Sequence, residues 1–177
     1  MFQPEYYGET KNHRFEDPKN RNWITLGGRE EDCRKVANLY KTVFTSDIII
    51  HYTDAKTAEL AKYMENSFYA AKVTFCNQFY ELADALNVNY DKLRETWLLD
   101  PRISRDHTFV YEDNRGYGGS CLPKDLSAII YQGKNCDVNV DFLEGIEKTN
   151  KEYVNYDKEI INTNYNSNDV NDASIGS

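Results

Sequence analysis

One uninterrupted helical pattern constrains this chain more than any other feature. Between Asp54 and Leu86 there is neither glycine nor proline, and apolar residues recur at steps of three and four. Their positions are Ala58, Ala61, Met64, Phe68, Ala71, Phe75, Phe79, Leu82 and Leu86. Aspartate commonly caps helix N-termini, as Asp54 would here, and Asn87 can close the other end. The pattern therefore predicts a single helix of about nine turns.

The segment before this helix, residues 1–53, has the order strand, helix, strand. A short apolar run, Trp23–Leu26, stops at two glycines, residues 30–43 have a helical pattern, and residues 47–52 form a second apolar run. Three adjacent isoleucines in the second run predict burial on both faces, as in a parallel sheet covered by helices. Because a parallel sheet needs further strands and crossover helices, we expect this segment to be the end of a larger sheet.

Helical patterns also dominate the part of the chain after the long helix. They cover residues 90–99, 122–131 and 140–153. Residues 161–177 are polar and rich in asparagine, so we expect a disordered tail. The predicted fold class is mixed α/β and mainly α. A short α/β stub at residues 1–53 is joined by the long helix to a helical central domain at residues 54–160.

Composition excludes several classes of function. Charged residues make up 28% of the chain, and no apolar run approaches the ~20 residues of a membrane span. The net charge is -8 and no dense basic run is present, which argues against nucleic-acid binding. His13, His51 and His107 are scattered, so we expect no metal site. Four widely spaced cysteines without a secretion leader predict reduced thiols in the cytoplasm.

The most informative stretch for chemistry is Gly-Tyr-Gly-Gly-Ser-Cys-Leu-Pro-Lys-Asp at residues 116–125. The glycines allow positive φ or close approach of a ligand, and Pro123 suits the first turn of a helix. Cys121 would then lie at the positive end of a helix dipole with Lys124 nearby, and both favour the thiolate. These are conditions for a nucleophile. The simpler interpretation is a buried structural cysteine after an ordinary glycine turn.

The same stretch resembles the catalytic-cysteine motif of the UDP-glucose/GDP-mannose dehydrogenase family. Three further segments match this family in order. Residues 4–9, Pro-Glu-Tyr-Tyr-Gly-Glu, resemble its Pro-Glu-Phe-x-x-Glu segment. Residues 62–66 match its Lys-x-x-x-Asn helix, and residues 100–103 match its Asp-x-Arg-Ile turn. The resemblance covers residues 4 to about 150, and implies the end of an NAD-binding Rossmann-like domain followed by the central dimerisation domain.

The resemblance implies oxidation of the C6 alcohol of a nucleotide sugar to a carboxylate, with NAD as cofactor. Cys121 would capture the intermediate aldehyde as a thiohemiacetal that becomes a thioester. Lys62 and Asn66 lie four residues apart, on one helix face, and match the family's stabilisers of the resulting oxyanion. Without the resemblance, this pair would be a solvated lysine and asparagine on an apolar helix.

Three carboxylates match catalytic or substrate positions of the family. Glu5 matches the glutamate that activates water for thioester hydrolysis, and Asp125 an aspartate that helps to organise this water. Glu9 matches a residue close to the sugar. Thr10 follows Glu9 where the family usually has glycine, a departure that makes Glu5 the better assigned base. In isolation, all three would be interpreted as surface acids.

The remaining assignments concern substrate and cofactor. Arg102 matches an arginine that reaches the substrate of the neighbouring subunit, although alone it would be interpreted as part of a surface ion pair. By the same resemblance, the backbone of the stretch from Glu112 to Gly118, including Tyr117, lines the substrate. Cys121 and Lys124 lie near NAD. The implied partners are a nucleotide sugar and a second copy of the chain, or a chain that supplies missing domains.

Two parts of the complete family enzyme have no counterpart in this sequence. There is no Gly-x-Gly-x-x-Gly turn for NAD, and no C-terminal nucleotide-binding domain. We therefore expect the chain alone to be inactive. The preferred hypothesis is a part of a dehydrogenase acting on UDP-glucose, GDP-mannose or a UDP-N-acetyl sugar. The alternatives are a non-catalytic dimerisation module and a cysteine-based binding protein or hydrolase, although no catalytic histidine accompanies Cys121.

Overall fold

The computed structural model describes residues 1–6, 17, 20–44 and 48–155. Within these, the chain forms two compact units, Met1–Glu65 and Asn66–Ser177, each of which is described by itself. The predicted tail and Glu9 lie outside the described residues. The division between the units falls inside the long helix, and the predicted domain bounds stay a prediction.

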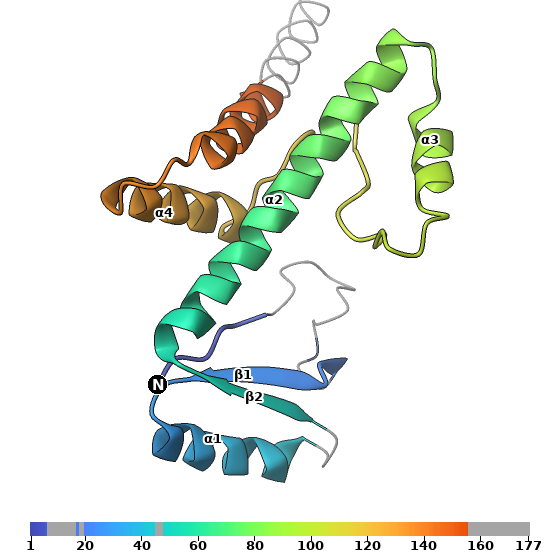
Figure 1. Cartoon of the computed structure of the whole chain (residues 1–177). Coiled ribbons are helices and arrows are strands. Elements are labelled where there is room, and N and C mark those ends of the chain that lie inside the picture. The colour runs from blue at the N-terminus through green and yellow to red at the C-terminus, as the bar shows by residue number, and fades with distance from the viewer. Residues whose placement is uncertain (7–16, 18–19, 45–47, 156–177) are drawn as a thin grey trace, which may run out of the picture. The chain divides into compact units, whose positions relative to one another are not determined.

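The first unit is a small parallel sheet with one helix. Strand β1 (Trp23–Gly27) is followed by helix α1 (Glu30–Val43) and strand β2 (Ile49–Thr53) (Figure 1). The two strands pair in parallel, with Trp23 opposite Ile49 and Gly27 opposite Thr53. Ile24 and Leu26 of β1 pack against Cys33 and Ala37 of α1 to form its core. The order strand, helix, strand is therefore as the sequence predicts.

The burial predicted for the isoleucine run on both faces is wrong. Ile49 is 62% exposed, whereas Ile48 and Ile50 are partly buried against the core beneath α1. Alternate residues of a strand point to opposite faces, and in the described part of this unit α1 covers only one of them. A hydrophobic strand is stabilised by burial, but its sequence does not show whether other elements cover both of its faces.

Helix α2 (Ala55–Ala85) confirms the long helix predicted from the sequence. Its N-terminus is capped by Asp54, whose Oδ1 accepts a 2.9 Å hydrogen bond from the Thr57 N–H. At its C-terminus Asn87 adopts the left-handed conformation at φ 55°, and the Val88 N–H donates to the Ala83 carbonyl at 2.7 Å. This is the closing geometry of a Schellman motif. Both ends of α2 are thus set by local chemistry.

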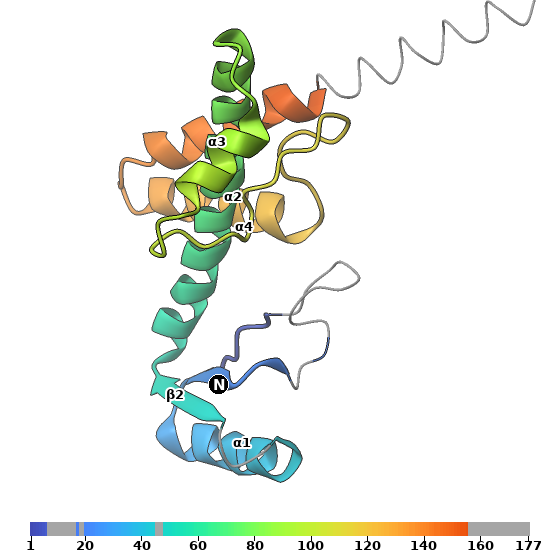
Figure 2. The same cartoon turned by 90° about the vertical axis from the view of Figure 1, so that its right-hand side faces the viewer.

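The second unit packs two helices against the C-terminal part of α2. They are α4 (Cys121–Asn135) and a helix over residues 141–155, seen beside α2 in Figures 1 and 2. Their shared core contains Ala70, Tyr117, Leu126, Ile130, Val140 and Ile146. Helix α4 begins one residue earlier than the predicted 122–131 helix and ends four residues later, since Gly133 does not interrupt it. This core fixes the end of α4 that carries Cys121.

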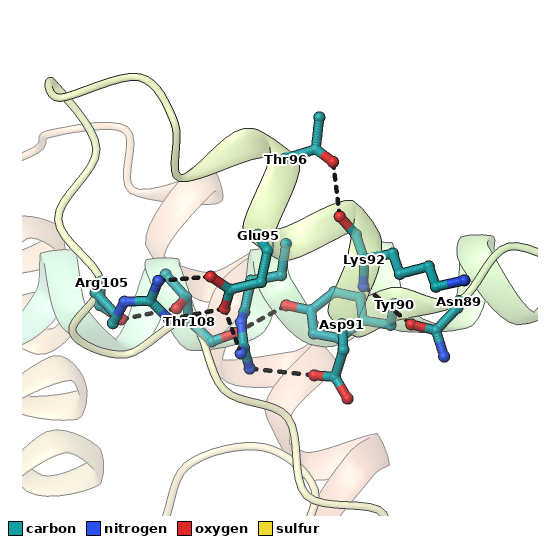
Figure 3. A network of polar contacts seen from close by, with 9 residues as sticks. Asn89, Tyr90, Asp91, Lys92, Glu95, Thr96, Arg105 and Thr108 are labelled. Atoms are coloured by element: carbon teal, nitrogen blue, oxygen red, sulfur yellow. Dashed lines mark hydrogen bonds and ion pairs between the residues drawn. The ribbon is translucent and has the colours of Figure 1, made fainter.

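Helix α3 (Tyr90–Trp97) is shorter than the predicted 90–99 helix. Asn89 caps it, because its side chain accepts a hydrogen bond from the Lys92 N–H (Figure 3). Tyr90 Oη donates to the Thr108 carbonyl at 2.9 Å, and Arg105 makes two hydrogen bonds to the Glu95 carboxylate. These contacts hold the loop after α3 against the helix. The Arg105 guanidinium is also the main reason that the pKa of Glu95 falls to about 2.

Candidate functional site

Cys121 is the first residue of α4, which the sequence analysis placed at a helix start. Its side chain is half-buried, and its Sγ lies 3.8 Å from Ser120 Oγ. Pro123 occupies the first turn, where its missing N–H has no intrahelical use. The first N–H groups of a helix carry a partial positive charge, which favours a thiolate over a thiol at this position. The structure therefore puts Cys121 where a nucleophilic sulfur is chemically favoured.

Asn66 and Asp125 form a buried hydrogen bond between α2 and α4. Asn66 Nδ2 donates to Asp125 Oδ2 at 2.5 Å, and the two residues are 4% and 7% exposed. Asp125 lies one turn after Cys121 on α4, so both are on the same side of that helix. Lys124 Nζ lies 3.5 Å from the other oxygen, Oδ1. Four predicted site residues, Cys121, Lys124, Asp125 and Asn66, thus gather at the start of α4.

The glycine-rich turn before Cys121 is fixed by two buried asparagines that the sequence analysis did not single out. Asn150 Oδ1 accepts from the Tyr117 N–H at 2.7 Å, and its Nδ2 donates to the Tyr117 carbonyl at 2.9 Å. Asn77 Oδ1 accepts from the Gly116 N–H at 3.3 Å. A signal was present, because Asn150 continues the apolar spacing of Val140, Leu143 and Ile146 and so falls at a core position.

Tyr117 is predicted to line the substrate with its main chain, and this stays a prediction. Its ring is part of the core of the second unit, and burial raises its pKa to about 12. Its main-chain N–H and C=O both bond to Asn150. Gly118 is more open, since a Cβ at this position would meet nothing within 4 Å. Of these two predicted substrate contacts, Gly118 presents the more accessible surface.

Lys62 and Glu5 lie in the first unit. Lys62 Nζ is 4.6 Å from the centroid of the Tyr6 ring, which is itself packed edge-on against Trp23. Burial is the main cause that raises the pKa of Tyr6. Glu5 is exposed. Lys62 precedes Asn66 by one turn of α2, so the predicted spacing of the two donors on one helix is present.

Arg102 and Glu112 lie in exposed parts of the second unit. Arg102 makes a surface ion pair with Asp100, with a guanidinium nitrogen 2.5 Å from the carboxylate and 85% of its side chain exposed. Glu112 accepts a 2.7 Å hydrogen bond from Tyr80 Oη. The structure brings neither residue to the start of α4. In the absence of substrate, both carry contacts that an exposed side chain can exchange.

The turn between β1 and α1 does not fit the pyrophosphate of NAD. A dinucleotide site of this kind places phosphate at a helix N-terminus behind closely spaced glycines. Here the first turn of α1 contains Glu30, Glu31 and Asp32, and Arg29 is paired with Asp32 at 2.8 Å. These carboxylates occupy the helix start that a dinucleotide site leaves free for phosphate, and they are paired with Arg29, Arg34 and Lys35. The first turn of α1 therefore lacks the features of such a site.

Two kinds of feature are absent from the part of the chain that the structure describes. It contains no group of three or more histidine, cysteine, aspartate or glutamate side chains placed to hold a metal ion. None of its helices combines the length and the apolar character needed to cross a membrane. Of the other cysteines, Cys33 and Cys76 are buried and Cys136 is exposed at the opposite end of α4.

Comparisons with known proteins agree with the motifs. The UDP-glucose/GDP-mannose dehydrogenase family, central domain, matches residues 56–152. UDP-glucose 6-dehydrogenase of Rickettsia typhi is 32% identical over 129 residues, which is 72% of this chain and 29% of that enzyme. The corresponding enzyme of Rhizobium meliloti is 32% identical over 133 residues, or 73% and 30% of the two chains. This chain thus spans less than a third of the length of these relatives.

Two solved structures have the same fold over most of the chain. A UDP-glucose dehydrogenase from Pyrobaculum islandicum aligns with a TM-score of 0.74 and 30% identity, over 85% of this chain and 33% of that one. A UDP-D-ManNAc dehydrogenase from Pyrococcus horikoshii aligns with a TM-score of 0.67 and 26% identity, over 84% and 33%. With its matched central domain and its cysteine at the start of α4, the chain belongs to the UDP-glucose/GDP-mannose dehydrogenase family.

Proposed function

We propose that this chain carries the covalent-catalysis part of an NAD-dependent nucleotide-sugar dehydrogenase, which oxidises a sugar C6 alcohol to a carboxylate. The observation that carries the proposal is the grouping at the start of α4. Cys121 is the first helical residue, and the buried Asn66 to Asp125 hydrogen bond lies one turn away. UDP-glucose is the proposed substrate, because the most similar relatives are named for it. GDP-mannose and UDP-N-acetyl sugars are the alternatives.

Cys121 is the proposed nucleophile. Its thiolate adds to the carbonyl carbon of the C6 aldehyde, and the carbonyl electron pair moves to oxygen to give a thiohemiacetal. Donors must meet the charge that develops on that oxygen, and Lys62 and Asn66 are the proposed donors. The Asn66 amide nitrogen carries two hydrogens, and its hydrogen bond to Asp125 orients the group through one of them.

Glu5 and Asp125 are the proposed residues for release of the product from the thioester. Glu5 takes a proton from water as this water attacks the thioester carbonyl, and the Cys121 thiolate leaves as the carboxylate forms. Asp125 organises the water. The proposed contacts to the sugar nucleotide are Glu9, Arg102, Glu112, the main chain of Tyr117, and Gly118. This chemistry needs a reduced cysteine, so we place the protein in the cytoplasm.

NAD would supply the hydride acceptor for the two oxidations. Because the sequence contains no Gly-x-Gly-x-x-Gly turn, we propose that a polypeptide supplying the remaining parts of a family enzyme binds most of this cofactor. Lys124 and Cys121 are the residues of this chain proposed to lie close to it. The complete activity is therefore proposed only for the chain together with the remaining parts of a family enzyme.

The test is NADH formation, followed by absorbance, with NAD and a panel of UDP- and GDP-sugars. The chain is assayed alone and mixed with polypeptides that supply the N-terminal and C-terminal parts of a related enzyme. We expect activity in the mixture, its loss in Cys121→Ser, and its retention in Cys136→Ser, the exposed cysteine at the other end of α4. A mixture that makes no NADH at saturating concentrations would contradict the proposal.

A second candidate is a dimerisation module, and an apolar row on α2 favours it. In the second unit Phe68, Phe75, Phe79, Leu82 and Leu86 are all between 40% and 71% exposed. They recur at steps that keep them near one face of the helix. Large exposed apolar surfaces of this kind mark interaction sites, so we propose that a second copy or a full-length relative covers it.

Analytical ultracentrifugation tests this candidate. Phe79→Glu puts a charge into the row and should convert dimers to monomers, whereas Gln78→Glu, exposed next to it, should leave the dimer intact. A second measurement distinguishes the dimerisation module from the catalytic part. If the chain is only a module, a full-length relative bound to it should have the same dehydrogenase activity whether the chain carries Cys121 or Cys121→Ala. A chain that is monomeric at all concentrations and binds no full-length relative would exclude the module.

A further inference from the structure

The turn that leads into Cys121 has almost no main-chain freedom where it leaves Arg115. Gly116 adopts φ 76°, and a Cβ at this position would lie 2.5 Å from Asn150 Oδ1. Both facts require glycine here. The next residue, Tyr117, has its ring in the core and both of its main-chain polar groups bonded to Asn150. The turn is therefore held by side-chain amides.

The Asn150 side chain satisfies both main-chain polar groups of Tyr117, as a neighbouring strand would in a sheet. One primary amide donates to the Tyr117 carbonyl and accepts from the N–H of the same residue, at 2.9 and 2.7 Å. Asn150 is 7% exposed, so these bonds compete little with water. Its helix, residues 141–155, belongs to the same core as α4 through Ile146 and Leu126. Asn150 thus connects the turn to a rigid part of the unit.

Asn77 fixes the preceding residues from α2. Its Oδ1 accepts from the Gly116 N–H at 3.3 Å and from Arg115 Nε at 2.6 Å, and its Nδ2 donates to the Val73 carbonyl at 3.0 Å. The Arg115 guanidinium lies 4.8 Å from the Tyr80 ring centroid and 4.9 Å from that of Tyr153. Three consecutive residues, Arg115, Gly116 and Tyr117, are therefore hydrogen-bonded by side chains from two different helices.

We infer that Asn150 is a positioning residue for the nucleophile. By fixing Tyr117, it sets the path of the turn and thereby holds Cys121 at the first residue of α4. A sulfur at that place feels the partial positive charge of the helix N-terminus, which decays within one turn. If the turn becomes more mobile, the first residues of α4 fray, and the helix N-terminus no longer stabilises the Cys121 thiolate. This inference rests on the proposed role of Cys121.

The test measures the alkylation of two cysteines of the same full-length chain by iodoacetamide at pH 7, resolved by peptide mass spectrometry. Cys136 lies at the C-terminal end of α4 and is exposed, so it is an internal reference. In Asn150→Ala, the ratio of the Cys121 rate to the Cys136 rate should fall about two- to fivefold, the size of a helix-terminus effect. Lys148→Ala, at an exposed position of the same helix, should leave the ratio unchanged.

An unchanged or increased ratio in folded Asn150→Ala would overturn the inference, as would an equal fall in Lys148→Ala. If Asn150→Ala does not fold, amide hydrogen exchange of the unmodified chain decides. The Tyr117 N–H should then exchange as slowly as the α2 core, and exchange at the rate of an open loop would overturn the inference. Neither measurement needs dehydrogenase activity, so failure of the proposed reaction would be seen separately, as an absence of NADH.

Discussion

The start of α4 and the surroundings of α3 are both rich in polar contacts, but of opposite kinds. At α4 the contacts are buried amide and carboxylate hydrogen bonds, of which Asn66 to Asp125 is the shortest. Around α3 the Arg94 guanidinium is buried, but other contacts are exposed ion pairs, such as Arg105 with Glu95 and Arg102 with Asp100. Breaking a buried bond leaves an unsatisfied group, whereas water replaces an exposed partner. The first region is therefore fixed in geometry and the second can exchange partners.

Asn66→Ala is expected to have the largest effect, and it tests whether the buried hydrogen bond at α4 stabilises the fold. It leaves the buried Asp125 carboxylate without its amide donor, and we expect a loss of about 2–3 kcal/mol in the free energy of unfolding, measured with urea. The matched control is the next residue, Ser67, which is also buried. Its Oγ has no hydrogen-bond partner among the described residues, so Ser67→Ala should be near neutral. Equal losses in the two variants would show that the Asn66 bond is not special.

A second test compares two glycines of one turn. Gly116→Ala must adopt positive φ and displace Asn150, so we expect a loss of about 1–2 kcal/mol or more in the same urea titration. Gly118→Ala places its Cβ in open space and should change stability by less than about 0.5 kcal/mol. If Gly118→Ala were the more damaging change, the turn would not have the geometry described here.

Glu95→Gln sharpens the other side of the comparison through its pH dependence. The pKa of Glu95 is lowered from its ordinary value of 4.5 to about 2, first by hydrogen bonds from Arg105. Its contribution to stability is therefore complete above pH 4.5 and is lost as pH falls towards 2. We expect the original chain and the variant to differ in free energy of unfolding, measured with urea at a series of pH values. This difference should become smaller as the pH falls from 4.5 towards 2. A difference that grows on acidification would contradict this assignment.

The parts of the structure that the sequence predicts are those determined locally. Asp54 and Asn87 set the ends of α2 through bonds to residues within five positions, and Pro123 marks the start of α4 in the same way. Such signals are contained in a short window of sequence. The position of Cys121 at a helix start followed from them, and so did the shared face of Lys62 and Asn66.

The parts that were missed depend on residues distant in sequence. Asn150 meets Tyr117 across 33 positions and Asn77 meets Gly116 across 39, so no local pattern reports either contact. The error at Ile49 has the same origin, because burial of a strand depends on layers that its own sequence does not contain. The apolar spacing of α2 is similar, since it marks a face without saying whether this chain or another covers it.

Arg102→Ala is expected to have the smallest effect on stability. It can therefore test a role in substrate binding without a change in folding. The Arg102 guanidinium is exposed and, among the residues that the structure describes, is paired only with Asp100, so Arg102→Ala should leave the urea midpoint unchanged. Arg115→Ala, at a guanidinium buried against Asn77, should lower that midpoint clearly. If Arg102 contributes to substrate binding, its removal should weaken UDP-glucose binding by calorimetry in a mixture that has dehydrogenase activity. A loss of affinity in a variant with an unchanged urea midpoint would therefore report a contact between Arg102 and the substrate.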